Sequence, residues 1–143
     1  MKLDLAEDRL SAWAGFRQEL NYSVTPLEDI AEFWGSTKLT YFNPKVDPYN
    51  YPSWPNPWQI IADNQYDDLT LALIIGYTIK LTSQFKDSQV EIRSMVDNAR
   101  TRLYNLVYID DQYVLNYNQG VVSVEEIPDS FFLENLVELA KPR

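Results

Sequence analysis

Apolar residues recur every three or four positions in the first part of the chain, and this spacing is the period of an amphipathic helix. It predicts a first helix from about Asp4 to Leu20. The segment TPLE at residues 25–28 has the form of a capping box with proline at the first helical position, so a second helix is predicted to begin there and to end near Gly35. The expected buried face of this second helix is Leu27, Ile30, Ala31 and Trp34.

A stretch rich in Asn, Pro and Tyr follows over Thr37–Pro57 and predicts an extended connection. It ends at Asn56-Pro57, a capping residue followed by proline, which predicts a short helix over Trp58–Ala62. From Tyr66 to Ser83 the chain is apolar on nearly every side of a helix. A helix of that kind is buried on every side, so we expect this segment to be the central helix of the protein.

The hydrophobic period falls to two after Asp87, which indicates strands. One strand is predicted to begin at Val90, and the segments 103–109 and 112–117 are predicted to pair around a turn. The segment 120–124 is predicted to be one more strand. This pattern is typical of an antiparallel sheet with one face packed on the central helix.

The last apolar residues, within Pro128–Leu139, are again three and four positions apart, and they predict a closing helix. We therefore predict an α+β fold, in which N-terminal helices and a buried central helix pack on an antiparallel sheet of three or four strands and a C-terminal helix follows. The 143 residues are predicted to form a single domain. Its parts are the helical residues 1–36, the extended connection 37–57, and the central helix, sheet and C-terminal helix in 58–143.

Cysteine and histidine are both missing from the chain. Without cysteine there is no thiolate nucleophile, no disulfide and no thiolate metal site, and without histidine there is no imidazole base at neutral pH. Glycine-rich phosphate loops are missing as well. These absences exclude hydrolases that use a Cys–His or Ser–His pair and nucleotide sites of the glycine-loop type, and we expect no cofactor.

The chain is acidic, with 21 Asp and Glu against 12 Lys and Arg and a net charge of −9 at pH 7. A phosphate backbone would be repelled on average, so no nucleic-acid partner is expected. The N-terminal segment MKLDLAEDRL lacks the apolar core of a signal peptide, and the longest apolar run, Leu69–Tyr77, is only about half a membrane span. We therefore expect no membrane contact and a location in the cytoplasm or in a virion.

Carboxylates gather where the central helix is predicted to begin. Asp63, Asp67 and Asp68 could bind a hard cation or act as acid and base, but acids at a helix start also cap its amides and complement its dipole, and we favour that interpretation. Asp110 and Asp111 fall at the predicted hairpin turn, where aspartate is common. The three acids near the helix start are therefore weak metal candidates, and no metal is expected.

Aromatic residues gather in the extended connection, above all in the segment YPSWPNPWQ at 51–59. Its tryptophans are expected mainly to pack on the body of the protein. The alternative is a binding surface, and among ligands we favour a protein, because Tyr and Trp are enriched at protein interfaces. The binding residues that this alternative predicts are Tyr49, Tyr51, Trp54 and Trp58.

From residue 53 the chain contains, in order, a Trp/Pro segment (SWPNPWQII, residues 53–61), an acidic turn, a helix, two strands and the segment VLN at 114–116. This order of features resembles the transglutaminase-like cysteine peptidases, the bacterial papain-like group in particular. The resemblance covers residues 53–128. It implies that the central helix begins at the position of the nucleophilic cysteine, that a strand carries the position of the histidine, and that the next strand carries that of the aspartate.

This resemblance assigns site positions, although the catalytic residue types are missing from them. Asp67 and Asp68 keep the two acids of the nucleophile segment. The positions of the cysteine, the histidine and the aspartate are taken, in that order, by Tyr66, by Tyr104 or Asn105, and by Asn116. The resemblance therefore implies a catalytically silent relative that keeps the fold, because a chain without thiol and imidazole cannot form the acyl-enzyme.

Together, these observations favour a non-catalytic structural or binding protein that acts through protein contacts within a possible multi-subunit assembly. The specific form of this hypothesis is a bacteriophage virion subunit of a neck, tail or baseplate. One alternative is a hydrolase that depends on carboxylates, with Asp63, Asp67 or Asp68 and Asp111 holding Mg²⁺ or Mn²⁺. Another is an acidic inhibitor or immunity-type protein that covers a basic partner site.

Overall fold

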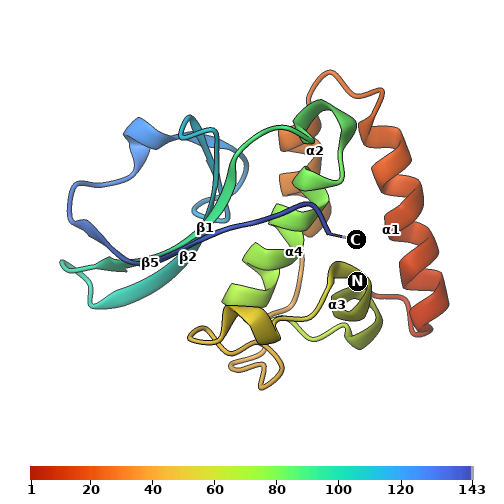
Figure 1. Cartoon of the computed structure of the whole chain (residues 1–143), viewed down its shortest axis with the longest axis horizontal. Helices are drawn as coiled ribbons and strands as arrows, with labels where there is room; N and C mark the ends of the chain where they lie inside the picture. The colour runs from red at the N-terminus through yellow and green to blue at the C-terminus, as the bar shows by residue number, and fades with distance from the viewer. Residues whose placement is uncertain (143) are drawn as a thin grey trace.

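The apolar periodicity of the N-terminal half becomes three helices in the computed structural model, which describes residues 1–142 (Figure 1). They are α1 (Ala6–Leu20), α2 (Pro26–Trp34) and α3 (Pro57–Asp63). The central helix α4 spans Asp68–Lys80, and every residue after Asp68 in it is buried. All four predicted helices of the first 83 residues are thus confirmed, although α4 begins two residues later than predicted.

Of the two caps predicted from the sequence, one is present and one is not. At α3 the predicted cap is present, since the Asn56 side chain accepts from the Gln59 backbone N–H and the Gln59 side chain accepts from that of Asn56. At α2 the predicted capping box is wrong, because the Thr25 side chain makes no cap hydrogen bond. Its hydroxyl donates instead to the carboxylate of Asp29, one turn into the helix, at 3.1 Å.

Five antiparallel strands follow the helices among residues 1–142, in the sheet order β4-β3-β2-β1-β5. The α+β class is therefore confirmed, and the sheet is larger than the three or four strands predicted. The strands are β1 (Val90–Asp97), β2 (Arg102–Ile109), β3 (Tyr113–Leu115), β4 (Val122–Ser123) and β5 (Phe131–Glu138).

The predicted C-terminal helix over Pro128–Leu139 is wrong, because this segment forms β5 and pairs with β1. The register shifts between Ser94 and Met95, whose partners on β5 are Asn135 and Leu133, so Glu134 is the extra residue of a β-bulge. A bulge adds one residue to the two-residue period. Apolar side chains three positions apart therefore share a face of the strand, and the sequence imitates a helical spacing.

Helix α4 lies between the other helices and the sheet (Figure 1). The main core contains the buried side chains of α4 and the residues of β1, β2 and β3 that face it. At Gly76 the helix comes so close to the sheet that an added Cβ would lie 2.5 Å from Cδ1 of Leu139. A smaller cluster covers the opposite face of the sheet and consists of Met95, Leu106, Tyr108, Val114 and Phe131.

The extended connection between α2 and α3 contains only a short 3-10 turn at Tyr51–Ser53. No helix within residues 1–142 has the length and apolar character that crossing a membrane requires.

Candidate functional site

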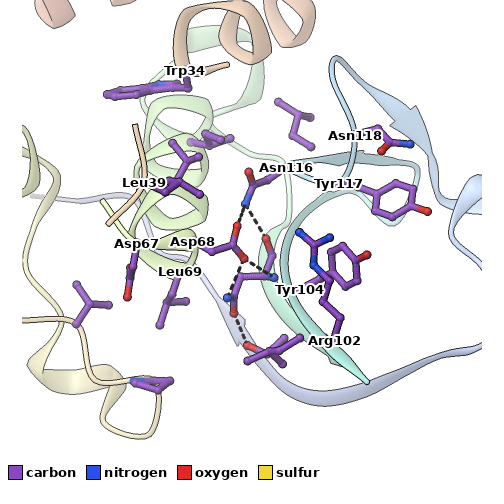
Figure 2. Close-up of a pocket in the computed structure, with 18 of the residues that line it drawn as sticks. Trp34, Leu39, Asp67, Asp68, Leu69, Arg102, Tyr104, Asn116, Tyr117 and Asn118 are labelled. Carbon is purple, nitrogen blue, oxygen red and sulfur yellow. Dashed lines mark hydrogen bonds between the residues drawn. The ribbon is translucent and has the colours of Figure 1, made fainter. Parts of the chain in front are cut away.

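The start of α4 meets the middle of β2 and the end of β3 at three polar residues, Asp68, Asn105 and Asn116, which we call the Asp–Asn–Asn cluster (Figure 2). One carboxylate oxygen of Asp68 accepts from the backbone N–H of Asn105 at 3.0 Å and from its side-chain amide at 3.1 Å. The other accepts from the amide of Asn116 at 3.3 Å. Asp68 thereby contacts two residues that lie 37 and 48 positions after it in the sequence.

The backbone holds each member of the cluster in place. Asn116 follows the last residue of β3 with φ of 65°, a left-handed conformation that asparagine tolerates better than most residues. Its amide also donates to the Asn105 carbonyl at 2.8 Å. On β1, the hydroxyl of Ser94 donates to Oδ1 of Asn105 at 2.9 Å. The cluster is thus a closed hydrogen-bond network that spans α4, β1, β2 and the end of β3.

The chemistry open to this network is limited by its groups. The two amides carry no charge and take up no proton in the physiological range, and the carboxylate already accepts three N–H bonds. No group in the cluster can form a thiolate, and neither amide can protonate a leaving group. The arrangement is therefore suited to fixing the positions of α4 and the strands, and to presenting polar atoms to a ligand.

Asp67, next to the cluster, has a different structural role, and its side chain points away from Asp68 (Figure 2). It is the N-cap of α4 and accepts from the Thr70 backbone N–H at 2.8 Å and from the Thr70 hydroxyl at 2.6 Å. Its second oxygen accepts from the backbone N–H of Asn43 at 3.2 Å. The buried Asn43 side chain also donates to the Gln65 carbonyl and to the Thr70 hydroxyl. These bonds tie the connection after α2 to the start of α4.

A cleft of about 900 Å³ opens above the cluster, between the connection after α2, the start of α4, and the ends of β2 and β3. Its floor includes all three residues of the Asp–Asn–Asn cluster, and Trp34 lies at one side (Figure 2). Its rim carries large apolar side chains that are well exposed, namely Leu39, Tyr41, Phe42 and Tyr49. Arg102, Tyr117 and Asn118 border the opposite side (Figure 2).

The structure brings together two of the predicted triad positions, Asn105 and Asn116, and leaves the third apart. Tyr66 lies before α4 and is buried against Trp34, with ring centroids 5.7 Å apart. Burial raises the pKa of Tyr66, and within residues 1–142 its hydroxyl has no hydrogen-bond partner. The residue that joins the two asparagines is Asp68.

Tyr104 and Asn105, the two residues predicted for the histidine position, lie on different faces of the sheet. Tyr104 points to the opposite face of the sheet, where its ring stacks on Phe131 at 4.9 Å and contacts Tyr117 edge-on at 5.9 Å. Asn105 is the β2 residue that reaches the start of α4.

The carboxylates proposed for a metal do not converge. Asp63 forms an ion pair with Lys45 at 3.0 Å, and Asp111 forms one with Arg93 at 3.2 Å. Asp67 caps α4, and Asp68 belongs to the cluster. Within residues 1–142, no group of three or more acidic, histidine or cysteine side chains could hold a metal ion.

The four predicted aromatic binding residues are divided between the cleft and the body of the protein. Tyr49 lies on the cleft rim. Trp58 packs edge-on against Trp13 at 6.2 Å, and Tyr51 packs against Trp54 at 5.2 Å. The rim residues Leu39, Tyr41 and Phe42 were not predicted from the sequence. The only signal for them was their place in a long polar connection, since exposure cannot be read from residue type.

No protein-family model matches the chain, and no curated protein matches its sequence. Solved structures do resemble it. Calcium-bound LapG of Legionella pneumophila has a TM-score of 0.74 at 16% identity, with 94% of this chain and 77% of that chain covered. EGTA-treated LapG has a TM-score of 0.68 at 18% identity, with 96% and 71% covered. LapG is a transglutaminase-like cysteine protease, and the chain therefore has a transglutaminase-like fold.

Proposed function

We propose that this protein is a non-catalytic binding protein that uses its transglutaminase-like fold to hold a segment of a partner protein in the cleft. The observation that carries the proposal is the Asp–Asn–Asn cluster. Asp68 at a helix start, Asn105 on a strand and Asn116 after the next strand stand in the order expected for nucleophile, histidine and aspartate. In this proposal Asp68, and not Tyr66, takes the place of the nucleophile.

The chemistry of these positions supports binding without cleavage. Peptide hydrolysis through an acyl-enzyme needs an activated nucleophile and a group that protonates the leaving amine. Neither asparagine amide can do the second, and the carboxylate of Asp68 is engaged by three N–H donors. A polypeptide bound over the cluster would therefore meet hydrogen-bonding groups and keep its peptide bonds.

The cleft rim supports a protein ligand. Tyr41 and Tyr49 are 105% and 85% exposed, and Phe42 is 66% exposed, so most of their ring surface is in water. Exposed aromatic side chains around a concave site with polar groups at its floor are typical of protein-binding surfaces. The connection that carries them is fixed to α4 through Asn43 and Asp67, which lowers the entropy cost of ordering the rim on binding.

The specific form of the proposal is a bacteriophage virion subunit of a neck, tail or baseplate, located in the virion after synthesis in the host cytoplasm. Its support is an aromatic surface suited to docking together with residue types that lack the usual hydrolytic groups. The genes on either side of the coding sequence test this form. Neighbours that encode virion proteins would support it, and neighbours that encode a metabolic operon would contradict it.

A library of random linear peptides displayed on phage particles tests the binding function. We expect the wild-type protein to select peptides with a shared apolar pattern, and their affinity is then measured by fluorescence anisotropy. The variant Phe42→Ser should weaken binding by roughly tenfold or more, as expected for an aromatic hot spot. The matched control is Tyr22→Ser, because Tyr22 is 89% exposed and does not line the cleft.

Two outcomes would contradict the proposal. If the selected peptides bind Phe42→Ser and the wild type equally well, the cleft is not the binding site. If mass spectrometry shows that the wild-type protein cleaves them while Asp68→Ala does not, the site is catalytic. Intact peptides after prolonged incubation, bound in the cleft, support a non-catalytic binding protein.

A further inference from the structure

Strand β5 is an outer edge of the sheet and leaves one side of its backbone without a strand partner within residues 1–142 (Figure 1). It is eight residues long and contains neither Lys nor Pro, which commonly protect such edges. Three apolar side chains on it are exposed, Phe132 at 57%, Leu133 at 53% and Leu136 at 39%. A long apolar edge strand of this kind is a template for pairing with another strand.

The bulge at Glu134 sorts these side chains onto two faces. Leu133 and Leu136 lie opposite Met95 and Arg93 of β1, and both therefore point to the face away from α4. Phe132 and Val137 lie opposite Val96 and Ile92, and both point to the α4 face. Without the bulge, residues three or five positions apart would point to opposite faces.

We propose that β5 pairs with β5 of a second copy of this chain, antiparallel and around a two-fold axis between Glu134 and Asn135. Such an axis is normal to the sheet and keeps every side chain on its face, so directly opposed residues must share a face. This register satisfies that condition. It places Leu133 opposite Leu136 on one face and Phe132 opposite Val137 on the other.

The charges of β5 favour the same register. Glu134, which on its own would discourage edge pairing, lies opposite the neutral Asn135. A two-fold axis through Glu134 would oppose that residue to its own copy, and like charges directly opposite are destabilising. An axis through Asn135 would oppose Leu133 to Val137, and these two residues lie on different faces of the sheet. The self-complementary pattern is the reason for proposing a second copy rather than an unrelated chain.

The pairing has a consequence for the cleft, because Glu134 and Asn135 also line it. The second copy would bring its own β5 to the border of the cleft and extend the sheet across the two molecules. The proposal does not depend on what the cleft binds, so it can fail or succeed independently of the proposed function.

Sedimentation equilibrium of the purified chain tests the proposal. We expect a dimer for the wild type, a monomer for Leu133→Glu, and a dimer for the control Leu103→Glu. Leu103 is a suitable control because it is also 53% exposed and belongs to β2, an inner strand. Circular dichroism establishes that each variant is folded. A folded wild type that stays monomeric up to its solubility limit overturns the proposal, as does loss of the dimer in both variants.

Charge variants at Asn135 test the register, because that residue would lie opposite Glu134. Asn135→Lys should lower the dimer dissociation constant and Asn135→Glu should raise it, each by roughly tenfold, since two equivalent pairs form around the axis. Equal effects of the two substitutions would overturn this register.

Disulfide formation gives a second measure of the register. The chain contains no cysteine, so the introduced thiols have no other thiol to pair with. Opposed residues of antiparallel strands have Cα atoms about 5 Å apart, within the range of a disulfide. The double variant Leu133→Cys/Leu136→Cys should therefore form a covalent dimer under oxidation. Leu133→Cys alone should not, because its two copies would be roughly 10 Å apart. A covalent dimer of the single variant, or none of the double variant, overturns the register.

Discussion

Asp68 determines what the start of α4 can do, because its carboxylate accepts N–H bonds from two residues that are distant in sequence. In the function proposed above, this carboxylate, held by amides, is a fixed hydrogen-bond acceptor at the place of a nucleophilic thiol. The buried amide of Asn105 has partners on both sides, Asp68 and Ser94. A closed polar network of this kind rigidifies the floor of the cleft.

Tyr66 gives a prediction about stability at the residue scale. Its hydroxyl is buried without a hydrogen-bond partner in residues 1–142, and such a group costs about 1–3 kcal/mol. The variant Tyr66→Phe removes the hydroxyl and keeps the ring against Trp34. We expect its free energy of unfolding, measured by urea denaturation at neutral pH, to rise by about 1 kcal/mol. Tyr22→Phe, at an exposed position, is the control and should change nothing.

The same residue makes stability depend on alkaline pH. Burial raises the pKa of Tyr66 above its value of about 10 in the unfolded chain. Above about pH 10 the unfolded chain gives up the Tyr66 proton, whereas the folded chain keeps it. The free energy of unfolding is therefore unaffected by this group below pH 10 and falls as the pH rises from there toward the folded pKa. Tyr66→Phe should lose less stability above pH 10 than the wild type. An equal loss would contradict this assignment.

At the residue scale, the sequence predicts which residues belong to the cluster more successfully than it predicts how they are arranged. Asn105 and Asn116 were predicted as site positions, and both are in the cluster. Tyr66, which was predicted for the nucleophile position, lies before α4 and packs on Trp34, and the residue that joins the two asparagines is Asp68.

The closing element shows why the sequence cannot always separate a strand from a helix. Residues 131–138 have apolar positions three apart, which is a helical spacing, and yet they form a bulged strand. The pairing partner decides the outcome, because without β5 one edge of β1 over residues 91–97 would have no strand partner for its backbone hydrogen-bonding groups. By contrast, α4 was predictable, since a helix that is apolar on all sides must be buried on all sides.

Two glycines test the packing of helices at the element scale. A Cβ on Gly76 would lie 2.5 Å from Leu139 Cδ1 and 3.3 Å from Ile92 Cδ1, whereas a Cβ on Gly15 in α1 meets nothing within 4 Å. Alanine favours a helix over glycine by about 1 kcal/mol. Gly15→Ala should therefore stabilise the protein by up to that amount, measured by urea denaturation. Gly76→Ala should destabilise it by about 1 kcal/mol, since overpacking outweighs the helical gain.

The outcome that would contradict this account is an equal gain in stability for both variants, which would mean that Leu139 moves aside at no cost. A double-mutant cycle with Leu139→Ala then measures the contact directly. Removing the Leu139 side chain should recover most of the cost of Gly76→Ala, because Leu139 is the side chain that the new methyl group meets first.

At the scale of the whole molecule, the sheet separates two regions of unequal packing. On one face, around α4, lies the main core, which joins all four helices to β1, β2 and β3. On the far face of the sheet lies the small cluster under β4 and the 3-10 turn Val124–Glu126. The cleft lies at the start of α4, where the main core ends.

The difference in packing between the main core and the small cluster predicts which segments unfold locally first. Amide hydrogen exchange, measured by NMR or mass spectrometry, checks this prediction. Amides of α4 should exchange only through global unfolding, because its residues from Leu69 to Lys80 are buried. Amides of β4 and of Val124–Glu126 should exchange at least roughly tenfold faster through local opening, since β4 is an edge strand and both segments pack on the small cluster. The Asn105 amide, which donates to Asp68, should exchange with α4. Exchange of β4 as slowly as α4 would mean that the two regions unfold as one unit.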